Sequence, residues 1–155
     1  MQHITGQIHR LLLKKHKTLA VAESCSGGLL SKLLTDMAGS SKYYLLGIVA
    51  YSNEAKGKIL NIPASTIAQK GAVSQEVADL MANSVRKLAR ADFGIGVTGI
   101  AGPTGGSKAK PVGTVFIAVG SKNINVRKKF IFTGNRLTIR QKAALQALRL
   151  LKSYL

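Results

Sequence analysis

Two hydroxyls and one thiol stand directly before a pair of glycines in the segment AESCSGG, residues 22–28. An apolar run precedes this segment and a helix-like run follows it, which predicts a turn between a strand and a helix. Backbone N–H groups at such a turn can stabilise an oxyanion, so a hydroxyl there could be the nucleophile of an acyl transfer. The segment matches neither GxSxG nor GxxxxGK. A glycine-rich turn whose serines only cap the helix is the alternative interpretation.

The residue types alone do not decide which of Ser24, Cys25 and Ser26 reacts. Cys25 is intrinsically the strongest nucleophile of the three, but it adjoins an apolar strand, where a small buried thiol is common. No histidine has an evident partnership with Cys25 in the sequence.

A lysine follows a cluster of polar side chains in the segment AYSNEAKGK, residues 50–58. Lys56 lies about one helical turn from Tyr51, Ser52 and Asn53, so a phenol, an amide and an amine could converge on one patch. Desolvation would lower the pKa of this lysine, and a neutral amine can take the proton of a serine hydroxyl. An exposed helix lysine is the alternative.

A glycine-rich loop follows a predicted strand in VTGIAGPTGGSKAKPVGT, residues 97–114. Its five glycines lose much conformational entropy on folding unless the backbone must approach something closely. Nests of backbone N–H groups of this kind bind phosphate or carboxylate. We therefore expect a ligand loop rather than a plain surface loop; the glycines are Gly99, Gly102, Gly105, Gly106 and Gly113.

Composition excludes several other chemistries. The only cysteine cannot form an internal disulfide, and the three histidines all fall in the first helix-like stretch, which argues against a metal site. The six carboxylates are too few and too scattered for a two-metal or glycosidase site. The net charge of +17 favours anionic partners. A phosphorylated small molecule fits better than nucleic acid, because only 5% of the residues are aromatic and the basic residues are scattered.

The hydrophobic pattern predicts one α/β domain with a mixed sheet and helices on both sides. Ser74 is the expected N-cap of a helix whose inward stripe is Val77, Leu80, Met81, Val85 and Leu88. Predicted helices cover residues 4–16, 29–39, 53–62, 75–90 and 135–155, and predicted strands cover 18–23, 43–52, 92–99, 114–120 and 124–132. No run is long enough for a membrane span or a signal-peptide core, so we expect a soluble cytoplasmic protein without membrane contact.

Five segments occur in the order and spacing of the CinA carboxy-terminal domain family, which the chain resembles over residues 5–150. They are AESCSGG, AYSNEAK, GAVS, VTGIAGPTGGS and KPVGT. The resemblance implies that residues 1–155 form a single three-layer α/β/α domain that often assembles into homo-oligomers. It also implies hydrolysis of the carboxamide of nicotinamide mononucleotide to nicotinate mononucleotide and ammonia, in pyridine nucleotide salvage, with no metal or organic cofactor.

The resemblance further implies roles for individual residues. Ser24 is the expected nucleophile, Lys56 its general base, and Tyr51 a residue that orients Lys56 or donates to the leaving group. Glu23 and Glu54 would organise hydrogen bonds around the site, and the backbone N–H groups of residues 25–28 would hold the oxyanion. The expected binding residues are Glu23, Cys25, Ser26, Gly27, Gly28, Asn53, Thr98, Gly99, Gly102, Gly105, Gly106 and Arg136.

Two departures from the family pattern are visible. Ser26 stands where the family often has threonine, which keeps the hydroxyl. Asn135 stands where the family commonly has aspartate, so an orienting contact to Arg136 would be weaker. A competence-associated nucleic-acid-binding protein with a vestigial pocket is the rival hypothesis, and hydrolysis of a different amide by the same residues is another.

Overall fold

A five-stranded mixed sheet runs through the middle of the molecule, whose computed structural model describes residues 2–155. The strands are β1 (Leu19–Glu23), β2 (Tyr44–Val49), β3 (Phe93–Gly99), β4 (Thr114–Gly120) and β5 (Asn125–Ile131). Their order in the sheet is β2-β1-β3-β4-β5. β1 is parallel to both of its neighbours, whereas β4 is antiparallel to β3 and to β5. The predicted hairpin of residues 114–132 is therefore confirmed.

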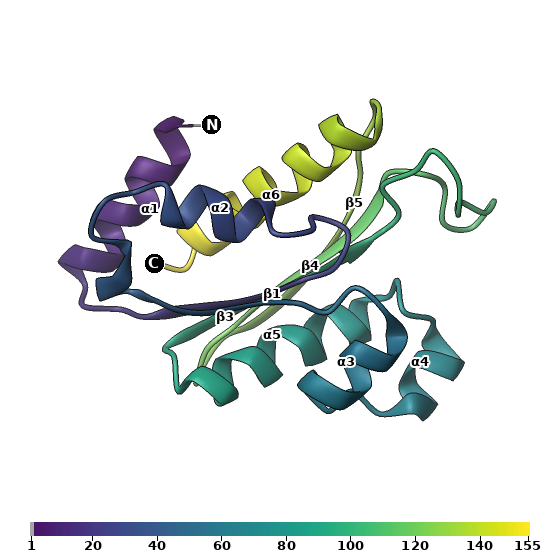
Figure 1. Ribbon diagram of the computed structural model, residues 1–155, viewed down its shortest axis with the longest axis horizontal. Helices are drawn as coiled ribbons and strands as arrows, with labels where there is room; N and C mark the ends of the chain where they lie inside the picture. Colours follow the sequence, from purple (N-terminus) through teal and green to yellow (C-terminus); the bar gives the residue numbers. More distant parts are fainter. Residues whose placement is uncertain (1) are drawn as a thin grey trace.

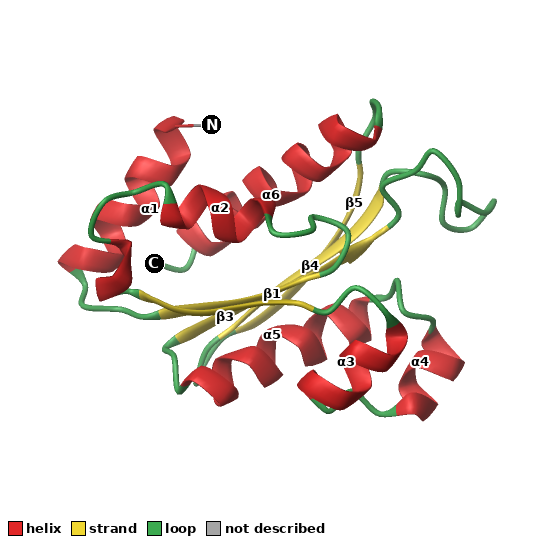
Figure 2. Ribbon diagram, in the orientation of Figure 1, coloured by secondary structure: helices red, strands yellow, loops and turns green. Residues whose placement is uncertain are grey.

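Helices cover both faces of the sheet, as Figures 1 and 2 show. One face carries α1 (Gln2–Lys14), α2 (Leu29–Thr35) and α6 (Arg136–Lys152). The other carries α3 (Asn53–Leu60), α4 (Ala64–Lys70) and α5 (Gln75–Ala89). The predicted three-layer α/β/α arrangement is confirmed.

The central strands are buried because helices cover them on both sides. All five residues of β1 are buried, and so are the first six of β3. The glycines of β3 allow α5 to lie directly on the strand: a Cβ atom on Gly94 would lie 2.1 Å from the carbonyl oxygen of Ala82, and one on Gly96 would lie 2.1 Å from that of Ala78. This contact holds the carboxyl end of β3 beside that of β1.

The inward face of α5 differs from the predicted stripe at one end. Ser74 caps the helix as expected and accepts a hydrogen bond from Val77 N. Leu88, however, is 51% exposed. The prediction was wrong because α5 packs on the glycines of β3 through the small residues Ala78 and Ala82, which turns Leu88 outward.

Three other element boundaries differ from the sequence prediction. The second helix ends at Thr35 rather than Gly39; the Thr35 hydroxyl donates to the carbonyls of Ser31 and Lys32, and a short 3-10 helix, η1 (Ser40–Lys42), follows Gly39. Helix α4 was not predicted, although Pro63 directly precedes it and proline is common at helix starts. The last helix ends at Lys152 and does not include Leu155.

Candidate active site

Ser24 lies where two crossovers of the sheet diverge. The chain passes from β1 to β2 on one side and later returns to β3 on the other, and such switch points at the carboxyl ends of parallel strands are frequent ligand sites. Ser24 N donates to Val97 O at 2.9 Å, and Ala50 N donates to Glu23 O at 2.9 Å. The hydroxyl-bearing turn is thereby fixed to both neighbouring strands.

The Glu23 carboxylate is used inside the fold. It is fully buried and accepts hydrogen bonds from Gly28 N at 3.0 Å, Leu30 N at 3.0 Å and Ser31 N at 2.8 Å. The Ser31 hydroxyl also donates to it at 2.5 Å. Glu23 therefore occupies the N–H groups at the start of α2 and does not line the pocket, which corrects its assignment as a binding residue. Its predicted part in organising hydrogen bonds fits these contacts.

The same contacts narrow the set of oxyanion donors. Gly28 N is bonded to Glu23, and Gly27 N donates to Ser24 O at 3.0 Å, so neither faces a substrate. Within residues 2–155, the N–H groups of Cys25 and Ser26 have no oxygen acceptor. These two remain as donors, whereas the prediction counted all four.

Arg140 of α6 holds this turn from outside, and no motif pointed to it. Its Nε and Nη2 atoms donate to Ser26 O at 3.3 and 3.1 Å, and Nη2 also lies 3.4 Å from Gly27 O. A Cβ atom on Gly27 would lie 2.9 Å from Nη2. The glycine at this position therefore admits the guanidinium group.

Lys56 reaches Ser24 from the first turn of α3. The Ser52 hydroxyl caps that helix by accepting from Ala55 N at 3.0 Å. Lys56 is only 2% exposed, and its Nζ lies 3.1 Å from Ser24 Oγ. Figure 1 shows α3 beside the carboxyl end of β1, where this contact is made. Ser24 and Lys56 are thus brought together, as the resemblance implied.

The other partners of Lys56 Nζ are backbone carbonyls, at 3.0 Å for Ala50 O and 3.3 Å for Tyr51 O. A neutral amine has two N–H donors and one lone pair, and a carbonyl oxygen can only accept. With the two N–H groups directed at the carbonyls, the lone pair is left for the Ser24 hydroxyl proton. The site can therefore hold the amine in the orientation that a general base needs.

Burial sets the protonation of both candidate reactive groups. Desolvation lowers the pKa of Lys56, and no ion pair with a carboxylate opposes it in the described residues. Desolvation also raises the pKa of the Cys25 thiol to about 12. The thiol packs in the hydrophobic core beside α2 and α6, so it stays protonated and is a poor nucleophile. The geometry therefore favours Ser24 over Cys25.

A cavity of about 290 Å³ opens at Ser24 and Lys56. It collects most of the predicted site residues, and leaves out Glu23, Ser26, Gly27, Gly28 and Gly106. Ser26 and Glu23 are fully buried, and Gly106 packs against Val112. The lining residues are Ser24, Cys25, Tyr51, Asn53, Lys56, Ala72, Val73, Thr98, Gly99, Ile100, Ala101, Gly102, Thr104, Gly105 and Arg136.

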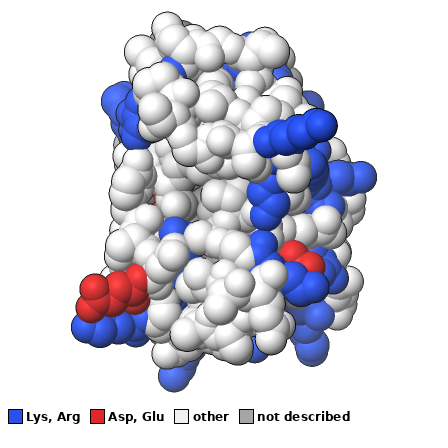
Figure 3. All heavy atoms as spheres, turned by 90° about the vertical axis from the view of Figure 1, so that its right-hand side faces the viewer, with Lys and Arg blue, Asp and Glu red and all other residues white. Residues whose placement is uncertain are grey.

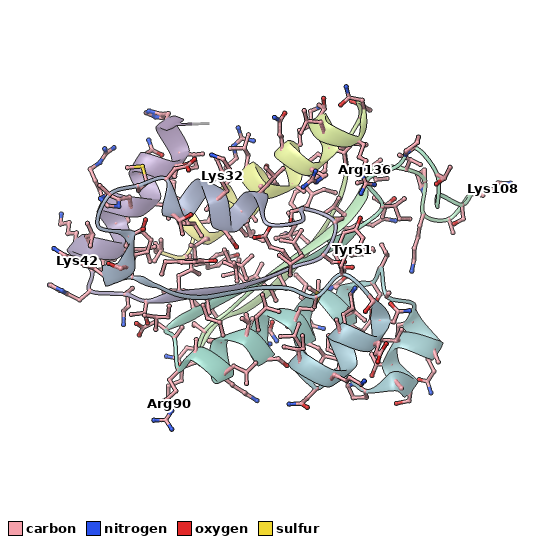
Figure 4. The ribbon with its side chains drawn as sticks, in the orientation of Figure 1. Lys32, Lys42, Tyr51, Arg90, Lys108 and Arg136 are labelled. Atoms are coloured by element: carbon pink, nitrogen blue, oxygen red, sulfur yellow. The ribbon has the colours of Figure 1, made fainter. Side chains whose placement is uncertain are left out.

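Arg136 and Tyr51 form one wall of the cavity. Arg136 donates through Nη1 to Gly102 O at 2.8 Å and through Nη2 to the Tyr51 hydroxyl at 2.7 Å. Figure 4 shows the two side chains at the same end of the molecule. The Tyr51 phenol therefore contacts Arg136, not Lys56; only the Tyr51 carbonyl contacts Lys56, which corrects the predicted orienting role of the phenol. Asn135 does not orient Arg136: its side chain caps α6 by accepting from Thr138 N at 2.9 Å.

The floor of the cavity was missed by sequence reasoning, although the GAVS segment was recognised as a motif. Ala72 and Val73 line it from the connection between α4 and α5. The Thr98 hydroxyl donates to Ala72 O at 2.9 Å, and Lys110 Nζ donates to Val73 O at 2.6 Å. These bonds join the glycine-rich loop to the α5 layer. Glu54, expected near the site, instead pairs with Lys58 at 2.6 Å on the surface.

The cavity is lined by cations without a carboxylate. Lys56 and Arg136 are its ionisable lysine and arginine side chains, and no aspartate or glutamate lines it. Figure 3 looks onto this end of the molecule, where most charged side chains are lysine or arginine. In the described part of the chain, no three histidine, cysteine or carboxylate side chains gather in a group that could hold a metal ion. No helix within residues 2–155 is long and apolar enough to span a membrane.

Known proteins of the same kind match over nearly the whole chain. A competence-damage inducible protein of Thermoanaerobacter sp. (strain X514) is 51% identical over 146 residues, which are 94% of this chain and 35% of the relative. A CinA-like protein of Geobacter sulfurreducens is 48% identical over 145 residues, again 94% of this chain and 35% of the relative. The chain thus spans about a third of the length of these relatives.

Solved structures agree with this result. The competence damage-inducible protein A of Klebsiella pneumoniae superposes with a TM-score of 0.95 at 36% identity, covering 98% of this chain and 94% of the other. A competence/damage inducible protein of Agrobacterium tumefaciens gives the same TM-score and identity, with 98% and 93% covered. The sequence model described as the CinA C-terminal domain matches residues 1–155. The chain belongs to the CinA C-terminal domain family.

Proposed function

We propose that this protein hydrolyses the carboxamide of nicotinamide mononucleotide to nicotinate mononucleotide and ammonia, with Ser24 as nucleophile and Lys56 as general base. The observation that carries the proposal is the buried contact of 3.1 Å between Lys56 Nζ and Ser24 Oγ, with two carbonyls engaging the other hydrogens of the amine. A nucleophile within hydrogen-bond reach of an oriented base is the arrangement that covalent catalysis requires.

The reaction would proceed in two halves. Lys56 accepts the Ser24 proton as Oγ attacks the amide carbon, and the N–H groups of Cys25 and Ser26 stabilise the oxyanion. The Lys56 ammonium then returns the proton to the departing nitrogen, so that ammonia leaves and an ester remains on Ser24. In the second half Lys56 takes a proton from water, hydroxide attacks the ester carbon, and the same proton returns to Ser24 Oγ as nicotinate mononucleotide is released.

The proposed substrate is chosen from the charges and surfaces of the cavity together with the family resemblance. Arg136 has a positive charge and no carboxylate partner among the described residues, which suits a phosphate group. Gly102 and Gly105 allow the loop backbone to approach the ligand. Apolar lining from Val73, Ile100 and neighbouring alanines offers a surface for an aromatic ring.

Release of ammonia tests the proposal directly. We expect ammonia and nicotinate mononucleotide from the wild type, and loss of both products in Ser24→Ala. Ser41→Ala, an exposed serine distant in sequence from the motif, is the matched control and should keep full activity. Equal background rates in the wild type and in Ser24→Ala would show that the proposal is wrong. Rates on nicotinamide, its riboside and its mononucleotide, measured together, test whether the phosphate is recognised.

The rival hypothesis of nucleic-acid binding is separated by salt dependence. It predicts DNA affinity that falls steeply with ionic strength yet remains measurable near physiological salt, together with no Ser24-dependent ammonia release. The hydrolytic proposal predicts the reverse for ammonia release.

A further inference from the structure

A second cavity lies at the other end of the sheet from Ser24. It has a volume of about 370 Å³ and is formed where α5 ends, β3 begins and β4 turns into β5. The length of β3, at roughly 3.3 Å per residue, places this cavity about 20 Å from the carboxyl edge of the sheet. Figure 4 shows Arg90, from this cavity, at the opposite end of the molecule from Tyr51 and Arg136. The second cavity is therefore separate from the proposed active site.

Cations from three segments line this cavity. Arg86 and Arg90 come from the end of α5, Lys122 from the turn between β4 and β5, and Lys17 from the residues before β1. Asp92 is the one carboxylate among the lining residues. The cavity therefore has a strong excess of positive charge.

Asp92 does not neutralise the whole group. Its carboxylate accepts from Thr18 N and from the Thr18 hydroxyl, each at 2.9 Å, and lies 3.2 Å from Lys17 Nζ. The hydrogen bonds from Thr18 and the Lys17 charge outweigh its desolvation and hold the pKa of Asp92 below its usual value, so it is ionised at neutral pH. Asp92 therefore compensates Lys17 and leaves the other cations without a counter-ion.

The remaining three cations have no partner. Within residues 2–155, Arg86, Arg90 and Lys122 make no ion pair and no side-chain hydrogen bond. Arg86 is the most constrained of them, because its Nε atom is shielded from solvent and has no acceptor. A guanidinium group that has lost part of its hydration without gaining an anion favours a ligand that supplies one.

Basic residues at the end of a helix also stabilise the helix by themselves, so Arg86 and Arg90 alone would not indicate a site. The facing turn supplies the second observation. The Ser121 hydroxyl oxygen accepts from Asn123 N at 3.2 Å and from Ile124 N at 3.1 Å, which leaves its own proton free to donate. Lys122 stands in the same turn. Donors from a separate element thus converge on the cavity from the opposite side.

We propose that this cavity binds a small phosphate-bearing anion, either inorganic phosphate or the phosphate end of a nucleotide. Three uncompensated cations and a hydroxyl donor match a group with more than one negative charge and several acceptor oxygens, which a lone carboxylate does not offer. The concave shape and the convergence of donors favour a small molecule over an extended nucleic-acid backbone, which is read by open basic surfaces.

The binding test uses NMR of the full chain labelled with ¹⁵N, at 0.15 M salt. Inorganic phosphate, adenosine diphosphate and a short single-stranded DNA are added in separate titrations. We expect saturable shifts of the amide signals of Ser121, Lys122 and Asn123 with phosphate or with the diphosphate. Comparable affinities indicate a free phosphate site, and a diphosphate affinity at least about tenfold higher indicates a nucleotide. Shifts at the Gly99–Gly105 loop report the active site separately.

Variants decide whether the named cations make the site. Lys122→Ala and Arg90→Ala, both exposed, should each weaken binding about tenfold or more, as expected for loss of a charge-assisted hydrogen bond. Lys87→Ala is the matched control: it is exposed on the same helix, removes the same charge and does not line the cavity, so binding should stay within about twofold. Linear shifts without saturation, equal losses in Lys87→Ala, or saturable shifts only with DNA would each overturn the proposal.

Discussion

Replacing Lys56 by methionine removes the amine that lies 3.1 Å from Ser24 Oγ and keeps an unbranched side chain of similar length in the buried space. General base catalysis contributes about 10²- to 10⁴-fold to a rate, which corresponds to about 3 to 5 kcal/mol of activation free energy. We expect the upper end of this range, because no other base lies within hydrogen-bond distance of Ser24 Oγ in the described residues. The KM should change little, since Nζ is bonded to Ser24 and two carbonyls.

The assay is steady-state ammonia release from nicotinamide mononucleotide, with circular dichroism to verify that each variant is folded. Lys58→Met is the matched control; this lysine stands on the same helix, is exposed and pairs with Glu54, and the variant should keep kcat within about twofold. Lys56→Arg keeps a positive charge that does not deprotonate, so it should be as inactive as Lys56→Met. A folded Lys56→Met or Lys56→Arg variant with more than about a tenth of the wild-type kcat would refute the assignment of Lys56 as the base.

Three further outcomes follow from the same geometry. Cys25→Ala should keep kcat within a few fold, because a thiol with a pKa of about 12 does not supply the nucleophile; a loss as large as that of Ser24→Ala would contradict this. Arg136→Met should raise KM for the mononucleotide by about 10- to 100-fold and leave the rate on the riboside unchanged, if Arg136 binds the phosphate; equal effects on both substrates would argue against this role. Unfolded Lys56 holds its proton up to about pH 10.5, whereas folded Lys56 releases it at lower pH, so the free energy of unfolding should rise with pH across this window. Urea titrations below pH 9.0, where the Cys25 thiol stays protonated in both states, should show this rise in the wild type and a smaller one in Lys56→Met.

The sequence predicted the layers of the fold because its periodicity is local. The buried strand before the Ser24 turn, the Ser74 helix start and the hairpin of β4 and β5 all have patterns contained within a few residues. The errors arise where distant packing decides. Leu88 faces outward because Gly94 and Gly96 of another strand draw α5 against them on a different face.

The candidate site divides in the same way. The motifs identified Ser24 and Lys56, and the family resemblance supplied their pairing, which local sequence leaves open. The N–H groups of Gly27 and Gly28 were expected to face the substrate, but the buried contacts of Glu23 and of the turn itself occupy them. Arg140 was missed because it stands 114 residues after the carbonyl of Ser26 that it holds, with no motif around it.

The protonation of Lys56 is the point on which the hydrolytic account depends most directly. NMR of the protein with ¹³C-labelled lysine side chains follows each Cε signal with pH, and the spectrum of Lys56→Met identifies the signal of Lys56. The account predicts that Lys56 titrates below the ordinary lysine value of 10.5 and that kcat rises with pH through the same transition. A Lys56 amine that stays protonated to pH 10.5 or above would contradict it, because the group facing Ser24 would then have no lone pair with which to accept the hydroxyl proton.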